Sequence, residues 1–189
     1  MSHDRWTKIT RMLHVHRVGD WRAWLRKHHK TSSEIWLVYY RKETGKPRIS
    51  YNDAVDEALC FGWIDSTAKK VDANRTAQRF TPRRAGSKTS EMNLARARRL
   101  VREGRMTPAG LKAIGTLRAR RLVVADDIKA ALKRDGPAWK HFQRFPVAYR
   151  RIRVAFVEGA RRRPAEFQRR LRNLVRKSAK NQRFGMVRE

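Results

Sequence analysis

The chain has 189 residues, of which 47 are Lys or Arg and 17 are Asp or Glu, giving a formal net charge of +30 at pH 7. Hydrophobic residues make up 40% of it, including 6 Trp and 7 Phe, which is enough for a packed core, so the charge does not indicate a disordered chain. No run approaches the ~18 apolar residues that a membrane span needs, and the first residues do not resemble a secretory signal. We therefore expect a cytoplasmic protein.

The positive charge is distributed unevenly. Residues 1–70 contain 14 Lys or Arg against 8 Asp or Glu, whereas residues 71–189 contain 33 against 9. A field of this sign attracts polyanions, so nucleic acid or anionic lipid is an expected partner through non-specific electrostatics. The alternative is an Arg-rich surface that is merely solvated.

The N-terminal part combines a short helix with a buried strand. In residues 20–28, Trp21, Trp24, Leu25 and His28 have helical spacing, which predicts a helix capped by Asp20. Residues 34–41 form a continuous aromatic and β-branched run, which predicts a central strand buried on both faces.

A second helix and a hairpin are predicted next. Ser50 gives a capping signal for a helix that Gly62 ends. Residues 63–68 and 76–80 have strand character and are joined by the turn 72–75, which is too short for a parallel crossover. These two strands should therefore be antiparallel.

After residue 82 the pattern is helical. Thr107 precedes a proline in an N-cap pattern, and the last helix should begin near Pro164 with Phe167, Leu171 and Leu174 facing inward. We predict an α+β fold, with a small antiparallel sheet of about three strands packed with helices and then a predominantly helical part. The predicted division is an α+β domain over residues 1–120 and a basic helical region over residues 121–189.

Three strings of residues resemble the YdeI/OmpD-associated family, also described as bacteriocin-protection proteins. They are residues 58–66, 78–83 and 104–111, and weaker similarity extends the resemblance over nearly the whole chain. The resemblance implies a role in bacteriocin protection or stress response and association with an envelope protein, but it implies no reaction. All three strings lie in the predicted domain 1–120, which therefore carries the family signature.

The densest group of special residues lies between residues 60 and 83. If the two hairpin strands pair, seven side chains should converge on one region of the sheet: Trp63, Asp65, Lys70, Gln78, Arg79, Phe80 and Arg83. An ion pair between Asp65 and Arg79 would orient the guanidinium toward an anion, which makes this region a candidate ligand site. The alternative is that the aromatic residues are core and the ion pair only fixes the register of the hairpin.

The C-terminal region offers a second candidate site. Seven arginines there form the hypothetical polyanion-binding surface: Arg161, Arg162, Arg163, Arg169, Arg170, Arg172 and Arg176. Contacts of such a surface with phosphates would be independent of sequence and sensitive to salt. A solvated helix face is the simpler interpretation.

The sequence gives no positive reason for an enzyme, a metal site or a cofactor. Cys60 precedes Phe61 and Gly62 at a predicted helix end, where a small buried hydrophobe is expected rather than a nucleophile. The pairs 14/16 and 28/29 of histidines lie among Lys and Arg, without Cys or Glu at ligand spacing. There is no Walker loop, nucleophile elbow or GxGxxG motif.

Three functions follow as hypotheses. The first is a non-enzymatic cytoplasmic binding or stress-protection protein of the YdeI/OmpD-associated type that engages anionic partners through the basic C-terminal surface. The second is a small-molecule or anion-binding domain with a pocket around residues 60–83, and the third is an unrecognised enzyme. The sequence does not indicate an oligomeric state.

Overall fold

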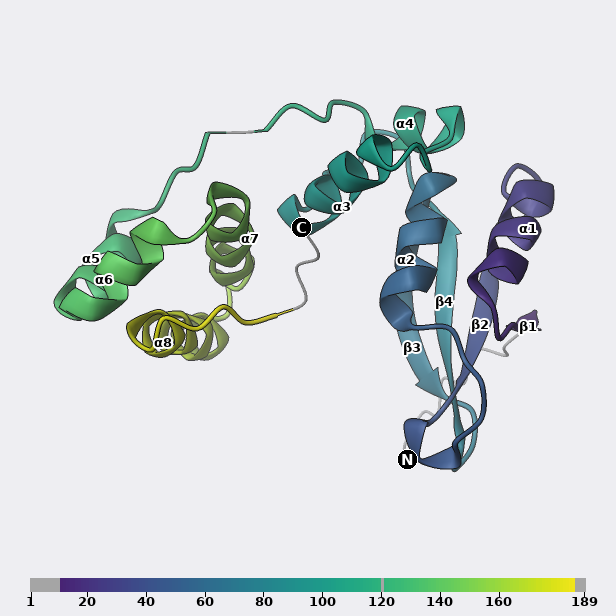
Figure 1. The fold of residues 1–189 in the computed structure, drawn as a ribbon, viewed down its shortest axis with the longest axis horizontal. Coiled ribbons are helices and arrows are strands. Elements are labelled where there is room, and N and C mark those ends of the chain that lie inside the picture. Colours follow the sequence, from purple (N-terminus) through teal and green to yellow (C-terminus); the bar gives the residue numbers. More distant parts are fainter. Residues whose placement is uncertain (1–10, 120, 186–189) are drawn as a thin grey trace. The chain divides into compact units, whose positions relative to one another are not determined.

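A computed structural model describes residues 11–119 and 121–185. The described chain forms two compact units (Figure 1). Unit 1 contains the described residues up to 88 together with 97–116, and unit 2 contains residues 89–96 together with the described residues from 117 onward. The predicted α+β class is confirmed, since unit 1 carries a sheet with helices and the rest is helical.

The sheet of unit 1 has four strands in the order β1-β2-β4-β3. Strand β2 (Ile35–Tyr40) pairs antiparallel with β4 (Arg75–Pro82), which pairs antiparallel with β3 (Trp63–Lys70), so the predicted hairpin is confirmed. Strand β1 (Met12–His14) lies parallel to β2 and makes the sheet mixed. The expectation of about three strands missed β1, because three residues are too few to show a periodic pattern.

Two helices cover one face of this sheet. They are α1 (Val18–His28) and α2 (Tyr51–Cys60), and a short 3-10 turn at Lys42–Thr44 lies between β2 and α2. Trp21 of α1 is fully buried: its ring lies 5.4 Å from that of Phe80 in β4, and its Nε1 donates to the carbonyl of Ala54 at 3.0 Å. Helix α1 begins at Val18, so Asp20 lies in its first turn and the predicted cap at that residue is wrong.

The opposite face of the sheet carries a smaller buried cluster. Trp36 and Val38 of β2 pack there with Ala77 of β4, and Val71 borders them. Strand β2 is thus buried on both faces, as its continuous apolar sequence predicted.

The end of α2 is joined to α4 (Pro108–Ile114) by main-chain contacts. Gly62 has a φ of +77°, which turns the chain sharply out of α2. Thr107, the predicted N-cap, accepts a hydrogen bond from the amide of Gly110 at 3.2 Å and donates its hydroxyl proton to the carbonyl of Cys60 at 2.6 Å. A Cβ on Gly110 would lie 2.2 Å from that Cys60 oxygen, so only glycine fits between the two helices.

Helix α3 (Glu91–Arg102) is divided between the units, with residues 91–96 in unit 2 and 97–102 in unit 1. Unit 2 also contains α5 (Asp126–Arg134), α6 (Gly136–Arg144), α7 (Val147–Glu158) and α8 (Pro164–Ala179). Their core includes Phe142, Tyr149 and Leu174, and α8 begins at the predicted proline. None of the helices in the described residues is both long and apolar enough to cross a membrane.

Unit 2 also buries an arginine. Arg153 of α7 is only 5% exposed, and its guanidinium carbon lies 5.6 Å from the ring centroids of Tyr149 and Phe156 and 5.0 Å from that of Phe184. Burial lowers the pKa of Arg153. The amide of Phe184 donates to the hydroxyl of Tyr149 at 3.0 Å, which holds the segment after α8 against this aromatic cage.

Candidate functional site

The structure separates Asp65 from Arg79. In the register of the sheet Asp65 is opposite Phe80, and Arg79 is opposite Trp36, so the two side chains lie on different faces. Arg79 instead donates its Nε proton to Glu34 at 2.7 Å, while Asp65 accepts the hydroxyl proton of Tyr51 at 2.6 Å. The predicted Asp65–Arg79 ion pair is therefore wrong.

The other members of the predicted ligand set are also dispersed. Trp63 and Phe80 are core residues, at 1% and 0% exposure, and Trp63 donates to the carbonyl of His29. Gln78 donates to the carbonyl of Ser66 at 3.1 Å, and Arg83 donates to the hydroxyl of Ser87 at 3.2 Å.

Lys70 lies at the end of β3 opposite Thr76, next to the hairpin turn. The seven residues therefore do not form one cluster, and ligand binding by any of them stays a prediction.

The seven predicted polyanion-binding arginines fall into two groups. Three of them are engaged by carboxylates of unit 2. Arg161 donates to Glu158 at 3.0 Å, and Arg169 and Arg170 donate to Glu166 at 2.7 and 2.6 Å.

The remaining four arginines project from unit 2 without an ion pair. Arg162, Arg163 and Arg172 are exposed and have no carboxylate within ion-pair distance among the residues described. Arg176 donates to the amide oxygen of Asn173 at 2.9 Å. These four side chains remain available for an external anion.

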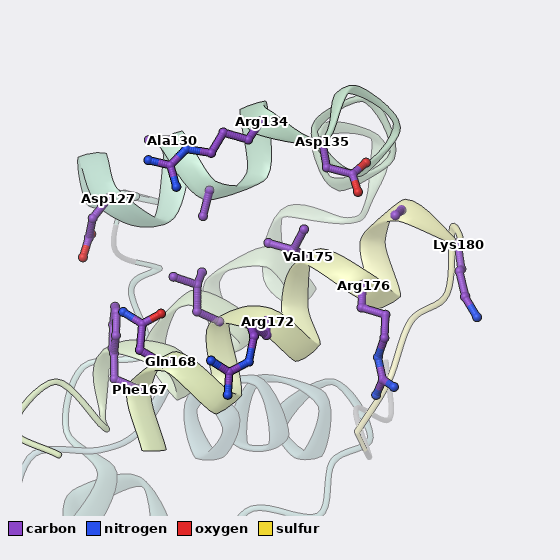
Figure 2. Close-up of a pocket in the computed structure, with 13 residues that line it drawn as sticks. Asp127, Ala130, Arg134, Asp135, Phe167, Gln168, Arg172, Val175, Arg176 and Lys180 are labelled. Carbon is purple, nitrogen blue, oxygen red and sulfur yellow. The ribbon is translucent and has the colours of Figure 1, made fainter. Parts of the chain in front are cut away.

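Two of these arginines line a groove of about 600 Å³ in unit 2 (Figure 2). It is bounded by α5 and the start of α6 on one side and by α8 on the other. Apolar side chains form much of its lining: Ala130, Ala131, Phe167, Leu171, Val175 and Ala179. Figure 2 shows Arg134 on the α5 side and Arg172 and Arg176 along α8. Lys180, directly after α8, is the fourth cation of the lining.

The two acidic residues of the lining have partners within the fold. Asp127 accepts a hydrogen bond from Arg161 at 3.2 Å, which lowers the pKa of the Asp127 carboxyl. Asp135 caps α6 by accepting the amide proton of Ala138 at 3.0 Å. The four cations of the lining, in contrast, form no ion pair with a carboxylate of the described chain. The groove therefore has a net positive potential over an apolar floor.

The sequence contained a signal for this groove that was not used. Arg172, Arg176 and Lys180 follow one another at intervals of four residues, which places them along one stripe of α8 and the residue that directly follows it. Leu171, Val175 and Ala179 form the adjacent apolar stripe. Arg134 could not be associated with them from the sequence, because its distance from α8 depends on how α5 packs.

Cysteine or metal chemistry has little support in the described residues. Cys60 is fully buried, and burial raises the pKa of its thiol to about 11, so the thiol is protonated at neutral pH. Among the positions with described coordinates, no three His, Cys, Asp or Glu side chains are grouped to hold a metal ion.

Comparison with known proteins gives two family matches. Residues 13–113 match a family described as a domain of unknown function (DUF8412). Residues 121–181 match the family described as "Bacteriocin-protection, YdeI or OmpD-Associated". No curated protein and no solved structure matches the chain.

The second match confirms the predicted resemblance over part of the chain. The strings 58–66, 78–83 and 104–111 lie within the first match, and the match to the YdeI/OmpD-associated family covers residues 121–181, in the helical region with the groove. The first match covers more than half of the 189 residues. The chain therefore belongs to the family defined by this domain of unknown function, and its residues 121–181 are similar to the bacteriocin-protection, YdeI or OmpD-associated family.

Proposed function

We propose that residues 121–181 bind an acidic, amphipathic segment of a partner protein in the α5–α8 groove, as the basis of a bacteriocin-protection type of function. The single observation that supports this is the groove, which combines an apolar floor with four cations that have no internal ion pair. In this proposal the protein is a cytoplasmic binding protein that catalyses no reaction.

The chemistry of the groove favours a peptide over other polyanions. An amphipathic helix binds a groove by burying its apolar face there, with side chains at spacings of three and four residues. Leu171, Val175 and Ala179 offer the matching stripe, and acidic side chains on the flanks of such a helix would meet Arg172 and Arg176. A nucleic-acid backbone would use the cations but would leave the apolar floor unused.

The charge of the whole matched segment supports an acidic partner. Residues 121–181 contain 18 Lys or Arg against 5 Asp or Glu. A positive field of this kind raises the rate at which an acidic partner is captured, while the apolar floor would provide contacts that salt does not screen. Binding should therefore weaken with salt without being abolished by it.

The test is a fluorescence-anisotropy titration of the full chain with a labelled peptide whose helical apolar face is flanked by glutamates. A peptide of the same composition in scrambled order, a DNA duplex and phosphatidylglycerol vesicles serve as comparison ligands. We expect the amphipathic peptide to bind most tightly, and the double variant Arg172→Gln/Arg176→Gln to weaken it by about tenfold or more.

The matched control is Arg162→Gln/Arg163→Gln, which removes the same charge from exposed residues outside the groove. This control should retain most of the affinity. An equal loss in both double variants, or tighter binding of the DNA or of the vesicles than of the amphipathic peptide, would show general electrostatic attraction instead of a docking groove.

A further inference from the structure

Unit 1 contains a smaller cavity, of about 170 Å³, on the face of the sheet that α2 covers. Tyr39 of β2 and its cross-strand neighbour Thr76 of β4 line it, together with Gln78. Arg48 and Tyr51, which lie just before α2 and at its first residue, complete the polar lining. The cavity is therefore bordered by strands and by the start of a helix, and it is open to solvent on one side.

The buried hydroxyl of Tyr39 is the unusual group in this cavity. Tyr39 is only 7% exposed, and its hydroxyl has no hydrogen-bond partner within the described residues. Burial raises the pKa of Tyr39 far above that of an ordinary tyrosine, so the hydroxyl keeps its proton and is a donor. Because native proteins satisfy nearly all buried polar groups, an unsatisfied donor on a residue that lines a cavity raises the question of which acceptor it meets there.

The neighbouring groups define what that acceptor should be. Arg48 donates to the carbonyl of Tyr40 at 3.1 Å and forms no ion pair with any carboxylate in the described part of the chain. Its charge is close enough to act on the Tyr39 hydroxyl. Tyr51 gives its own proton to Asp65, whose charge also acts on Tyr39. The lining thus offers a cation and a donor side by side.

We propose that this cavity binds a small carboxylate, with its oxygens on the Tyr39 hydroxyl and the Arg48 guanidinium. The planar guanidinium matches a carboxylate in shape as well as in charge. The volume equals that of about six water molecules, so the ligand has few carbon atoms and is much smaller than a drug-sized molecule. This site lies in unit 1 and shares no residue with the groove, so either proposal can fail without the other.

The experiment is a two-dimensional amide NMR titration of the full chain with glycolate, lactate and pyruvate. Propane-1,2-diol serves as an uncharged comparison, and inorganic phosphate as a different anion. We expect saturable shifts of amides in β2, in β4 and at the start of α2 with the carboxylates. Tyr39→Phe and Arg48→Gln should each weaken this binding by about tenfold or more.

Two matched controls separate the site from the overall charge of the protein. Tyr40→Phe removes a hydroxyl from the neighbouring residue on the other face of β2, and Arg41→Gln removes one positive charge outside the cavity. Both controls should bind as the unmodified protein does. Tyr39→Phe keeps the ring and removes only an unsatisfied hydroxyl, so its melting temperature should not be lower than that of the unmodified protein. If it is lower, the binding test rests on Arg48→Gln alone.

The proposal is overturned if none of the carboxylates gives saturable shifts at these amides, or if Tyr39→Phe and Arg48→Gln bind them as tightly as the unmodified protein does. Equal or tighter binding of phosphate or of the diol would also overturn it, because the site would then not recognise a carboxylate.

Discussion

Arg99 of α3 and Asp56 of α2 form a buried ion pair, with 2.5 Å between Nη2 and Oδ2 and side-chain exposures of 10% and 1%. The next residue of α2, Glu57, is 3% exposed at its side chain and is held by Arg22 and Arg105, each at 2.6 Å. Two adjacent carboxylates of one helix are thus neutralised by three arginines from different parts of unit 1.

Removing one partner of this pair should strongly destabilise the fold. Arg99→Met removes the guanidinium that faces the buried Asp56 carboxylate, and breaking a buried pair in this way costs about 3–5 kcal/mol. We expect the free energy of unfolding, measured in urea, to fall by that amount. The double variant Arg99→Met/Asp56→Leu should recover much of it, since neither charge of this pair is then left. A loss below about 1 kcal/mol in the single variant would show that Asp56 is solvated or otherwise compensated.

The carboxylate of Glu166 should make stability depend on pH at the acidic end. Hydrogen bonds from Arg169 and Arg170 lower the pKa of Glu166 to about 2, whereas an unfolded chain has a Glu pKa of about 4.3. The contribution of the ionised Glu166 to the free energy of unfolding is therefore fully present above pH ~4.3 and is lost as the pH falls through about 2. The difference in melting temperature between the unmodified protein and Glu166→Gln should shrink over that interval. A difference that stays constant between pH 5 and 2 would contradict this.

Cys60 should be unreactive in the native protein. Its side chain is fully buried and burial raises its thiol pKa to about 11, so little thiolate exists at neutral pH. Reaction with a disulfide reagent at pH 7 should be slow and should become fast only in denaturant. Fast modification of the folded protein, with its circular dichroism spectrum unchanged, would show that the thiol is accessible.

The segment after α8 should stabilise unit 2. The ring of Phe184 covers the guanidinium of Arg153, and the Phe184 amide is bound by Tyr149. Because Phe184 is half-buried, Phe184→Ala should lower the free energy of unfolding by about 1–3 kcal/mol, less than in a full core position. Val147→Ala, at an exposed position of α7 outside the cage (45% exposed), is the comparison and should cost less. Equal losses would mean that the cage contributes no more than ordinary surface contacts.

The sequence predicted elements better than it predicted which side chains meet. The run 34–41 was sufficient to predict β2, and the turn 72–75 was sufficient to predict the hairpin, because strand length and turn length are local properties of the sequence. The Asp65–Arg79 pair failed because contact across a hairpin depends on register. Here Asp65 faces Phe80, and a register shift follows between Asp65 and Ala68. A shift of one residue moves a side chain to the other face.

The groove of unit 2 and the smaller cavity of unit 1 could not be predicted from the sequence for a related reason. Tyr39 lies in a run that predicted only core, and nothing in that run shows that its hydroxyl would lack a partner. Arg134 lines the groove only because α5 packs beside α8. The buried carboxylates Asp56 and Glu57 could not be foreseen either, since two of the arginines that hold them lie more than 40 residues away. Each of these features depends on tertiary packing.

The contact between α2 and α4 has a consequence for how this protein tolerates sequence change. Gly110 contacts the Cys60 carbonyl directly, and Gly62 turns the chain with a positive φ. Because the backbone makes this contact, the side chains of neighbouring residues can change without disrupting it. In a saturation-mutagenesis profile, these two glycines should therefore reject every substitution while the exposed Leu111 beside them accepts many. The strings 58–66 and 104–111 would then be constrained mainly by the close backbone contact between α2 and α4. Gly62 and Gly110 should accordingly be more informative about relatives than the residues around them.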